Sequence, residues 1–467
     1  MHRGSRRSAG CGACRRDKIK CDEVRPICER CLRAGRECVF PPQFHFVNTN
    51  TRFAAPETRE RSALQRTGAE GLNAKLSLLY ELLRYRSATP SSISRDSSPP
   101  VPKAPSLSRG EKIALKLAAS FKIRPDGYQL HHLGRYIAEI PCRLGHNPAL
   151  DIAVECLLYP EYMRALQTLQ KVIADPVLGT SAETVCATML MAHYEMIAPE
   201  RRPQQYIAHA GGASKVISIR GPGRVCTNFE YNLFRTQRGR IVLEALLRGE
   251  HCFLLTGGWQ DICPEKCGSI EFSSVDCLFE SICSIPTLVK YVVDWKAGVS
   301  EIGKGEIIDY GRKLQQTLRA ASPLGSVSRD VEDNLGFEER QSSTLDGEFP
   351  LSFHFYSHES AIFHTWRWMA LLIVDLCLVN LLANPRLRLA IAETARRICM
   401  CYEYASLSSP LGAQFLQVPL IIAYVVSDQK GNNWIIDKIN LLLGGLYVTY
   451  TEEYLDHLST MIMKGIK

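Results

Sequence analysis

The sequence predicts three parts: a small metal-stabilised module, a linker and a large all-α region. Six cysteines recur at regular spacing within residues 11–38. Residues 87–110 are rich in Ser and Pro and have almost no large apolar side chain, which is typical of a flexible tether. Helical periodicity without strand–helix alternation dominates the rest. We therefore assign residues 1–42 to the module, 43–110 to the linker and 111–467 to the all-α region.

Positive charge is concentrated at the N-terminus. The first 42 residues hold eleven Lys or Arg against five Asp or Glu, a balance of +6 out of +8 for all 467 residues. A surface that binds a polyanion is therefore expected there. The chain begins without an apolar export segment, so its eighteen cysteines indicate a reducing intracellular compartment rather than a disulfide scaffold.

The stretch CGACRRDKIKCDEVRPICERCLRAGREC writes the spacing C-x2-C-x6-C twice, seventeen residues apart. Thiolates are the preferred ligands of structural zinc, and two tetrahedral ions need about eight metal–sulfur bonds. Six thiolates supply that number only if two of them bridge both ions. The repeat makes three bridging pairs equivalent: Cys11 with Cys28, Cys14 with Cys31, and Cys21 with Cys38. The competing arrangement is one ion held by Cys11, Cys14, Cys28 and Cys31.

The module has too few large apolar residues to fold by burial alone. Residues 11–42 contain six: Ile19, Val24, Ile27, Leu32, Val39 and Phe40. Metal binding is therefore expected to supply much of the folding free energy, and Cys11→Ser or Cys28→Ser to unfold the module.

The whole cysteine pattern, with CRRDKIKCD after the first cysteine and Pro26 two residues before Cys28, resembles the fungal binuclear zinc cluster (Zn2Cys6) transcription factors. The resemblance implies two short helices around two Zn²⁺ ions, with the first and fourth cysteines as bridges. One ion would then take Cys11, Cys14, Cys21 and Cys28, and the other would take Cys11, Cys28, Cys31 and Cys38.

The six residues between Cys14 and Cys21 include no Gly or Pro and predict a short basic helix. A basic helix fixed to a metal centre suits a major groove, where Lys or Arg donates to guanine O6 and N7. The resemblance implies CGG-like triplets in double-stranded DNA, with Lys18 as the base-reading position. Three further basic residues are the expected DNA contacts, chiefly to phosphate: Arg15, Arg16 and Lys20. Asp17 departs from the family, where this position is commonly basic, so it bears on triplet choice.

Four leucines of the linker, Leu72, Leu76, Leu79 and Leu83, recur at 4-3-4 spacing. This is the seam of a short coiled coil of about two heptads. A homodimer seam and a helix that docks on the C-terminal region fit the spacing equally well, because an isolated helix this short is marginal.

In the C-terminal region we expect helices over residues 149–158, 162–174, 182–197, 207–219, 240–254, 360–383 and 387–405. The apolar run 369–383 is fifteen residues long with Asp375 and Asn380 inside it, too short for a membrane span, so we interpret it as a buried helix and expect no membrane partner. Residues 329–348 hold seven acids against two arginines and are expected to form an exposed loop.

Residues 184–223 resemble the fungal-specific transcription factor regulatory domain, through His193-Tyr194-Glu195, His209-x-Gly211-Gly212 and Arg220-Gly221-Pro222. The resemblance implies control of activity by a small-molecule effector or a co-regulator protein. We interpret His193, Tyr194 and His209 as a helix-packing cluster rather than a ligand site.

Two other sets of residues are interpreted as structural. The histidines His354, His358 and His364 have no HExxH order and are expected in an aromatic-rich core. The thiols Cys263, Cys267, Cys399 and Cys401 have no complementary second pair and are expected to be buried.

No GxSxG, P-loop or dinucleotide-binding fingerprint is present, so no enzyme is predicted. The favoured function is a nuclear, sequence-specific DNA-binding regulator of genes transcribed by RNA polymerase II. The alternative is a zinc-containing redox sensor or enzyme in which the cluster is only structural.

Overall fold

The structure of the protein is a computed structural model. It describes residues 12–17, 19–22, 28–34, 107–120, 130–158, 162–197, 203–268, 273–322, 336–343, 348–382, 384–444, 446 and 449–466. The coiled coil predicted at 72–83 lies outside the described residues, as do Cys11, Lys18 and Cys38.

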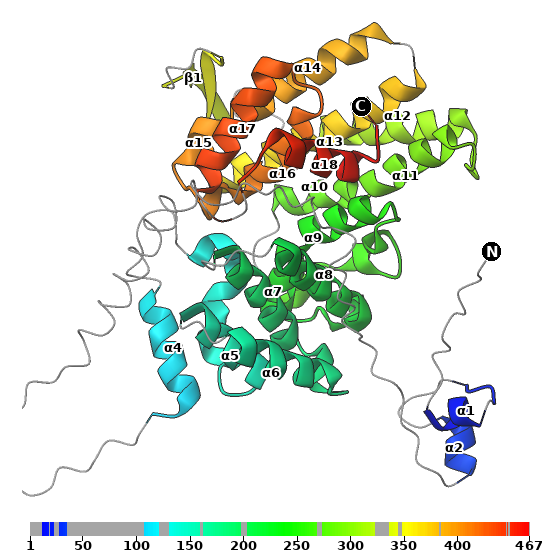
Figure 1. The fold of residues 1–467 in the computed structure, drawn as a ribbon, viewed down its shortest axis with the longest axis vertical. Coiled ribbons are helices and arrows are strands. Elements are labelled where there is room, and N and C mark those ends of the chain that lie inside the picture. The colour runs from blue at the N-terminus through cyan, green and yellow to red at the C-terminus, as the bar shows by residue number, and fades with distance from the viewer. Residues whose placement is uncertain are drawn as a thin grey trace, which may run out of the picture.

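The N-terminal module contains two helices of five residues each, α1 (Gly12–Arg16) and α2 (Glu29–Arg33) (Figure 1, blue). Their starts differ by seventeen residues, as the cysteine repeat does, which confirms the expectation of two short helices. The predicted bounds of the first were wrong. Its last turn closes where Asp17 N–H donates to the Ala13 carbonyl (3.1 Å), so Lys20 follows the helix rather than lying in it.

A first group of helices, cyan to green in Figure 1, lies in the earlier part of the C-terminal region. It comprises α4 (Arg109–Ser120), α5 (Pro148–Leu158), α6 (Tyr162–Ala174), α7 (Ala182–Ile197), α8 (Pro203–Arg220) and α9 (Asn228–Arg248). Helix α7 is enclosed by α5, α6, α8 and α9. It is apolar on nearly all sides, as a helix buried all round must be.

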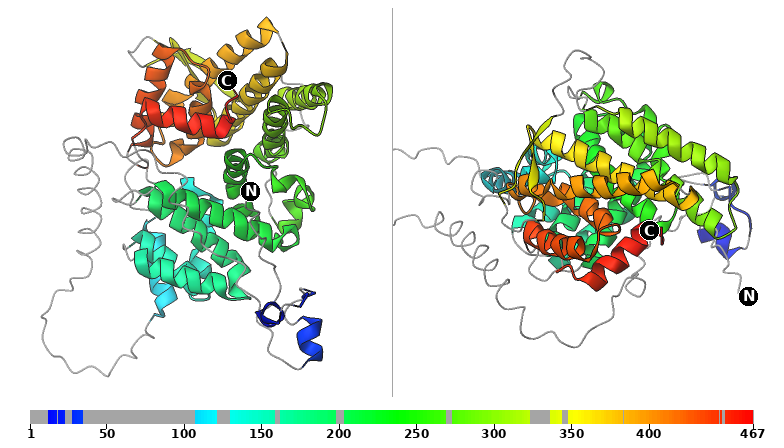
Figure 2. Two further views of the ribbon diagram at one scale, coloured as in Figure 1. Left: turned by 45° about the vertical axis from the view of Figure 1, so that its right-hand side comes forward. Right: turned by 90° about the horizontal axis from the view of Figure 1, so that it is seen from above.

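The second group includes nine helices and a hairpin among the described residues. The helices are α10 (Ser274–Ile282), α11 (Ile285–Lys296), α12 (Lys304–Ala320), α13 (His358–Leu381), α14 (Pro385–Cys399), α15 (Tyr402–Ser406), α16 (Gln417–Tyr424), α17 (Gln429–Leu443) and α18 (Glu452–Met463). The strands are β1 (Phe337–Gln341) and β2 (Leu351–Phe355). Helix α13 packs against α10, α11, α12, α14 and α16. In the left view of Figure 2 the orange and red helices of this group lie above the cyan and green helices of the first group.

Short 3-10 helices connect the longer elements. They are η1 (Leu130–Leu133), η2 (Arg135–Glu139), η3 (Pro141–Arg143), η4 (Leu178–Thr180), η5 (Pro222–Arg224), η6 (Phe253–Leu255), η7 (Trp259–Asp261), η8 (Glu265–Cys267) and η10 (Gly412–Leu416).

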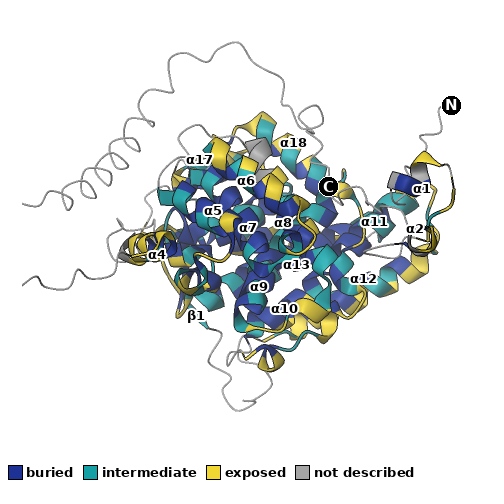
Figure 3. Ribbon diagram, turned by 90° about the horizontal axis from the view of Figure 1, so that it is seen from below, coloured by how far each residue is buried: buried dark blue, intermediate teal, exposed yellow. Residues whose placement is uncertain are grey.

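Helix α9 joins the two groups. It packs against α7 and α8 on one side and against α10, α11 and α18 on the other. The C-terminal end of the described chain also returns to it, because Lys464 Nζ donates to the Leu247 carbonyl. The buried apolar residues of both groups form one continuous cluster, which lies in the interior of the ribbon in Figure 3.

Helix α13 is long and apolar enough to cross a membrane by length and composition, the only such helix among the described residues. However, 72% of its most apolar window is buried inside the protein. The expectation of a buried helix over residues 369–383 is therefore confirmed. Its charged residue Asp375 is buried and accepts a hydrogen bond from Gln315 of α12.

The expectation of an all-α region was wrong in one place. Strands β1 and β2 pair antiparallel, with Phe337 opposite Phe355 and Gln341 opposite Leu351. The acid-rich segment 329–348 therefore contains a strand rather than only an exposed loop. Alternation in FHF places Phe353 and Phe355 in the core, and the Glu403 carboxylate of α15 holds the hairpin by accepting from Ser342 Oγ and Ser352 Oγ.

Most predicted helices are present, and two of them, 162–174 and 182–197, have the predicted bounds. The helix predicted over 240–254 instead spans Asn228–Arg248. A capping box between Thr227 and Glu230 begins it, and Gly249 ends it with a left-handed φ of 68°. The helix predicted over 387–405 is divided into α14 and α15.

Candidate metal centre and nucleic-acid interface

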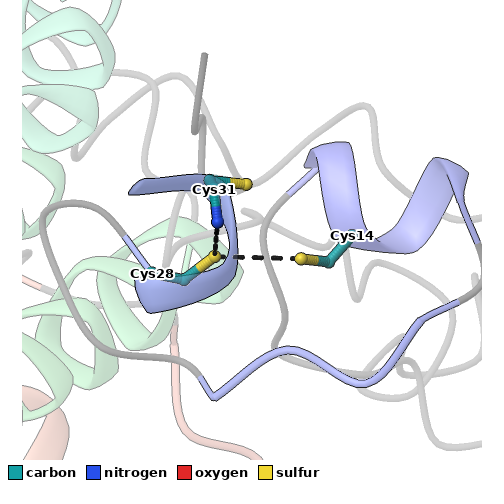
Figure 4. Close-up of side chains that lie close together, drawn as sticks. All are labelled: Cys14, Cys28 and Cys31. Carbon is teal, nitrogen blue, oxygen red and sulfur yellow. Dashed lines mark hydrogen bonds between the residues drawn. The ribbon is translucent and has the colours of Figure 1, made fainter. Parts of the chain in front are cut away.

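Three of the six repeated cysteines meet in the structure. Cys14 lies on α1, Cys28 directly precedes α2, and Cys31 lies on α2. Their Sγ atoms all lie within 4.8 Å of one another, and all three residues are fully buried. Figure 4 shows the three side chains converging from the two helices. Together they form a buried group of three soft ligands.

The spacing of these sulfurs agrees with tetrahedral zinc. The Sγ atoms of Cys14 and Cys28 are 3.8 Å apart. Zinc–sulfur bonds of about 2.3 Å at a tetrahedral angle separate two sulfurs by about 3.8 Å. The Cys31 backbone N–H donates to Cys28 Sγ at 3.4 Å, which stabilises negative charge on that sulfur. These residues therefore fit a zinc-thiolate centre.

Cys28 also belongs to a second group of potential ligands. Its sulfur lies within 4.8 Å of Cys21 Sγ and of an Asp22 carboxylate oxygen. Cys28 thus lies near Cys14 and Cys21, which the resemblance assigns to one ion, and near Cys31, which it assigns to the other. The three gathered cysteines, Cys14, Cys28 and Cys31, are common to both predicted arrangements, the two-ion cluster and the single-ion site. Asp22 was not predicted as a neighbour of the centre, although it directly follows the third cysteine.

The cysteines themselves form the apolar core of the module. The buried cluster consists of Ala13, Cys14, Cys28 and Cys31, with Cys21 packed against it. It shares no residue with the large core of the helical region. The described part of the module therefore has almost no apolar burial that could hold it together without metal.

The basic residues that are described lie on the outside of this core. Arg16 and Lys20 are exposed, and so is the intervening Asp17. Arg15 lies in α1, but its side chain is not described, and Lys18 lies outside the described residues. Among the described residues between Cys14 and Cys21, the side chains of Arg16, Asp17 and Lys20 are therefore exposed together.

The helical region confirms that His193, Tyr194 and His209 take part in helix packing. His193 Nε2 lies 3.1 Å from Tyr136 Oη, and His209 Nε2 lies 3.4 Å from Tyr162 Oη. The Tyr162 and Tyr194 rings stack at 5.3 Å. Burial lowers the pKa of His209 to about 4, so this imidazole is neutral near neutral pH.

The other histidines also have aromatic surroundings, as expected. His364 is buried among the rings of Phe337 and Trp368, with ring centroids at 4.9 and 5.5 Å. His354 faces Tyr404, whereas His358 contacts Phe415.

Of the four thiols expected to be buried, Cys267, Cys399 and Cys401 are buried. Cys263 was predicted wrongly, because it is half-exposed and donates to Glu265 Oε2 at 3.0 Å.

Comparison with family models matches residues 9–45 to the fungal Zn(2)-Cys(6) binuclear cluster domain. This match contains all six cysteines and ends before the helical region.

Several curated fungal proteins are similar over part of the chain. "Uncharacterized protein AN5342" of Emericella nidulans is 27% identical over 137 residues, which are 28% of this chain and 29% of that protein. "C6 finger domain transcription factor hasF" of Aspergillus fumigatus is 32% identical over 84 residues, 18% of this chain and 11% of that protein. "Abscisic acid cluster transcription factor abl7" of Leptosphaeria maculans is 56% identical over 36 residues, 8% of this chain and 6% of that protein.

The chain thus spans less than a third of the length of each of these relatives. No solved structure matches the chain. The matched residues, the cysteine repeat and the gathered thiols agree with one another. Residues 9–45 are therefore a fungal Zn2Cys6 binuclear cluster domain, a metal-binding type of DNA-binding domain.

Proposed function

We propose that the protein is a nuclear, sequence-specific transcription regulator that binds double-stranded DNA through a binuclear zinc cluster and controls genes transcribed by RNA polymerase II. The observation that carries this proposal is the buried group of Cys14, Cys28 and Cys31, next to a segment in which Arg16 and Lys20 are exposed. Relatives whose printed names are transcription factors support it.

In the proposed centre, two Zn²⁺ ions are held by the six cysteines, with Cys11 and Cys28 shared. The ions fix the backbone between Cys14 and Cys21. Because the backbone of this short segment is already ordered before it binds DNA, little conformational entropy is lost on binding.

Lys18 is the proposed base-reading residue, donating to guanine O6 and N7 of a CGG-like triplet. Arg15, Arg16 and Lys20 are proposed to contact DNA alongside it, chiefly at phosphates. The exposed Asp17 lies beside Arg16 and repels phosphate, so contacts by this segment depend on its orientation in the groove.

The helical region is proposed to control activity in response to a small-molecule effector or a co-regulator protein. Both groups of helices share one buried core and both pack against α9, so a shift of helices in one group can alter packing in the other. Residues 72–83 are proposed either to pair two chains or to dock on this region.

Selection of binding sites from random duplex DNA by the zinc-loaded full chain tests the proposal. Enrichment of CGG-like triplets is the expected result, and a fixed spacing between two triplets would identify a homodimer. The matched control is Cys28→Ser, which should select nothing. Equal selection by both chains, or no enrichment by the wild type, would contradict the proposal.

A further inference from the structure

A cleft lies between α9, α10 and the segment that connects them. The space within the cleft and the solvent at its open mouth together measure about 480 Å³, so the cleft is shallow rather than enclosed. Aromatic rings from each of the three elements line it, namely Phe234 of α9, Phe279 of α10 and Trp259 of η7. The Phe234 and Trp259 rings stack with centroids 5.6 Å apart. The cleft therefore offers flat apolar walls, which suit a planar ring.

A buried arginine supplies the polar end of the cleft. The Arg238 side chain is only 8% exposed, and its Nη2 donates to Asp276 Oδ1. The guanidinium also lies over the Phe279 ring, 5.0 Å from its centroid. Its Nε–H is buried and has no hydrogen-bond acceptor among the described residues. A buried donor without an acceptor is costly, so a ligand that supplies one is stabilised.

Several acidic groups share the charges around Arg238. Asp276 also binds Arg235, whose Nε lies 3.1 Å from Oδ1, so one buried carboxylate serves two guanidinium groups. Glu280 lines the cleft too, and burial raises the pKa of its carboxyl group. Arg235 also pairs with Glu359, whose Oε1 lies 3.3 Å from its Nη2. These groups therefore carry no surplus positive charge, and the Glu280 carboxyl opposes an anionic ligand whenever it is ionised.

We propose that this cleft binds a small aromatic monocarboxylate. The ring lies against Trp259 and Phe234, and the carboxylate accepts from Arg238. The proposal names the class of effector for the regulatory role proposed above, and only the consequence of binding rests on that role. The binding itself does not involve the zinc cluster.

Binding requires part of the cleft to shift, because the Arg238 Nε atom is buried in the structure. The wall that carries Trp259 is the part that can move most easily. The wall consists of three one-turn helices, η6 to η8, joined in part by Gly257 and Gly258 with left-handed φ values of 64° and 81°. Single turns are held by few hydrogen bonds, so displacement of this wall costs less than displacement of α9 or α10. Trp259 fluorescence is therefore expected to change on binding.

Isothermal titration calorimetry on the zinc-loaded full chain tests the proposal, with benzoate, 4-hydroxybenzoate, phenylacetate and indole-3-acetate as probes. At least one probe should bind with saturation, and its uncharged amide should bind about tenfold more weakly or not at all. Arg238→Gln should weaken binding of the acid by about tenfold or more and abolish the preference for acid over amide.

Two further variants distinguish loss of the binding site from misfolding of the protein. Glu280→Gln removes the opposing carboxyl group at an exposed position and should tighten binding of the acid, a gain that misfolding cannot produce. Lys438→Met removes a cation near the rings of Tyr402 and Trp434, away from the cleft, and should leave binding unchanged.

Absence of saturable binding by every probe would overturn the proposal, as would equal affinity of acid and amide. DNA binding is measured on the same preparation without probe. Loss of probe binding with intact DNA binding refutes the effector site alone, whereas intact probe binding without DNA binding refutes the proposed function alone.

Discussion

Cys14 and Cys31 occupy the same place in two helices that the chain repeats seventeen residues apart. Each is the third residue of its five-residue helix, and both are fully buried. Cys28 lies between them, 3.8 Å from Cys14 in Sγ–Sγ distance, and also reaches Cys21. This arrangement makes Cys28 the described ligand whose loss affects the most partners.

Cys28→Ser should therefore remove zinc from the module and abolish DNA binding. Native mass spectrometry of the full chain should find two zinc ions in the wild type and at most one in the variant. Far-UV circular dichroism should change little, since the module shares no core residue with the helical region. Cys142→Ser is the control, because this exposed thiol only donates to the Glu139 carbonyl. Two zinc ions in Cys28→Ser would refute the bridging role.

Lys18→Ala and Lys20→Ala should weaken DNA binding in different ways. Loss of a base contact by Lys18 should cost about 1–3 kcal/mol on a CGG-containing site and relax the preference for it. Loss of a phosphate contact by Lys20 should weaken all sequences alike and reduce the slope of log K against log salt by about 1. Titrations of specific and random duplexes at two salt concentrations distinguish them. An equal loss on both duplexes for Lys18→Ala would count against base reading.

Stability should fall in mild acid because of His209. Its pKa is lowered by burial to about 4, whereas an unfolded histidine titrates near 6.5. At pH values between 4 and 6.5 the unfolded chain binds more protons at this position than the folded chain does. The contribution of the neutral, buried His209 to folding stability is therefore present above pH 6.5 and is lost as the pH falls towards 4. The loss between pH 7 and 5 is about 2 kcal/mol.

Urea denaturation at pH 7 and pH 5 measures this effect. His209→Gln should show a smaller difference in unfolding free energy between the two pH values than the wild type does. His457→Gln, at an exposed position, is the control and should behave as the wild type. An unchanged pH dependence in His209→Gln would show that another group is responsible.

Gly179→Ala should destabilise the helical region. A Cβ atom at this position would meet the Ile173 carbonyl oxygen at 2.5 Å, and backbone cannot move aside cheaply. We expect a cost of about 1–3 kcal/mol. Gly305→Ala, in α12 with nothing within 4 Å of the added atom, should instead stabilise by about 0.5–1 kcal/mol. Thermal unfolding monitored by circular dichroism compares the two, and similar melting temperatures would contradict the packing argument.

Helices were predictable where a local signal marked both ends. For residues 182–197 the apolar run itself is as long as the helix, and the bounds agree. The twelve residues missed at the start of α9 are rich in polar and charged side chains that tertiary contacts bury, such as Arg238 with Asp276. The periodicity of apolar residues does not reveal ion pairs of this kind, because the partners are far apart in the sequence. The hairpin was missed because its acidic strand is mostly exposed and is held by Glu403, far along the chain.

The gathering of Cys14, Cys21, Cys28 and Cys31 could be predicted, because their spacing is typical of zinc-binding cysteines. Asp22 directly follows Cys21, and its position was simply overlooked. The cleft beside Arg238 could not be predicted, since it depends on how distant segments approach one another. For the cleft, Trp259 and Phe279 are twenty residues apart, and no local pattern relates them.

The buried core of the zinc-cluster module is separate from that of the helical region, and this has a consequence when zinc is scarce. A chain that loses its metal keeps a folded helical body, because that body has its own interior. If the proposed function holds, zinc supply would therefore control DNA binding without unfolding the helical region.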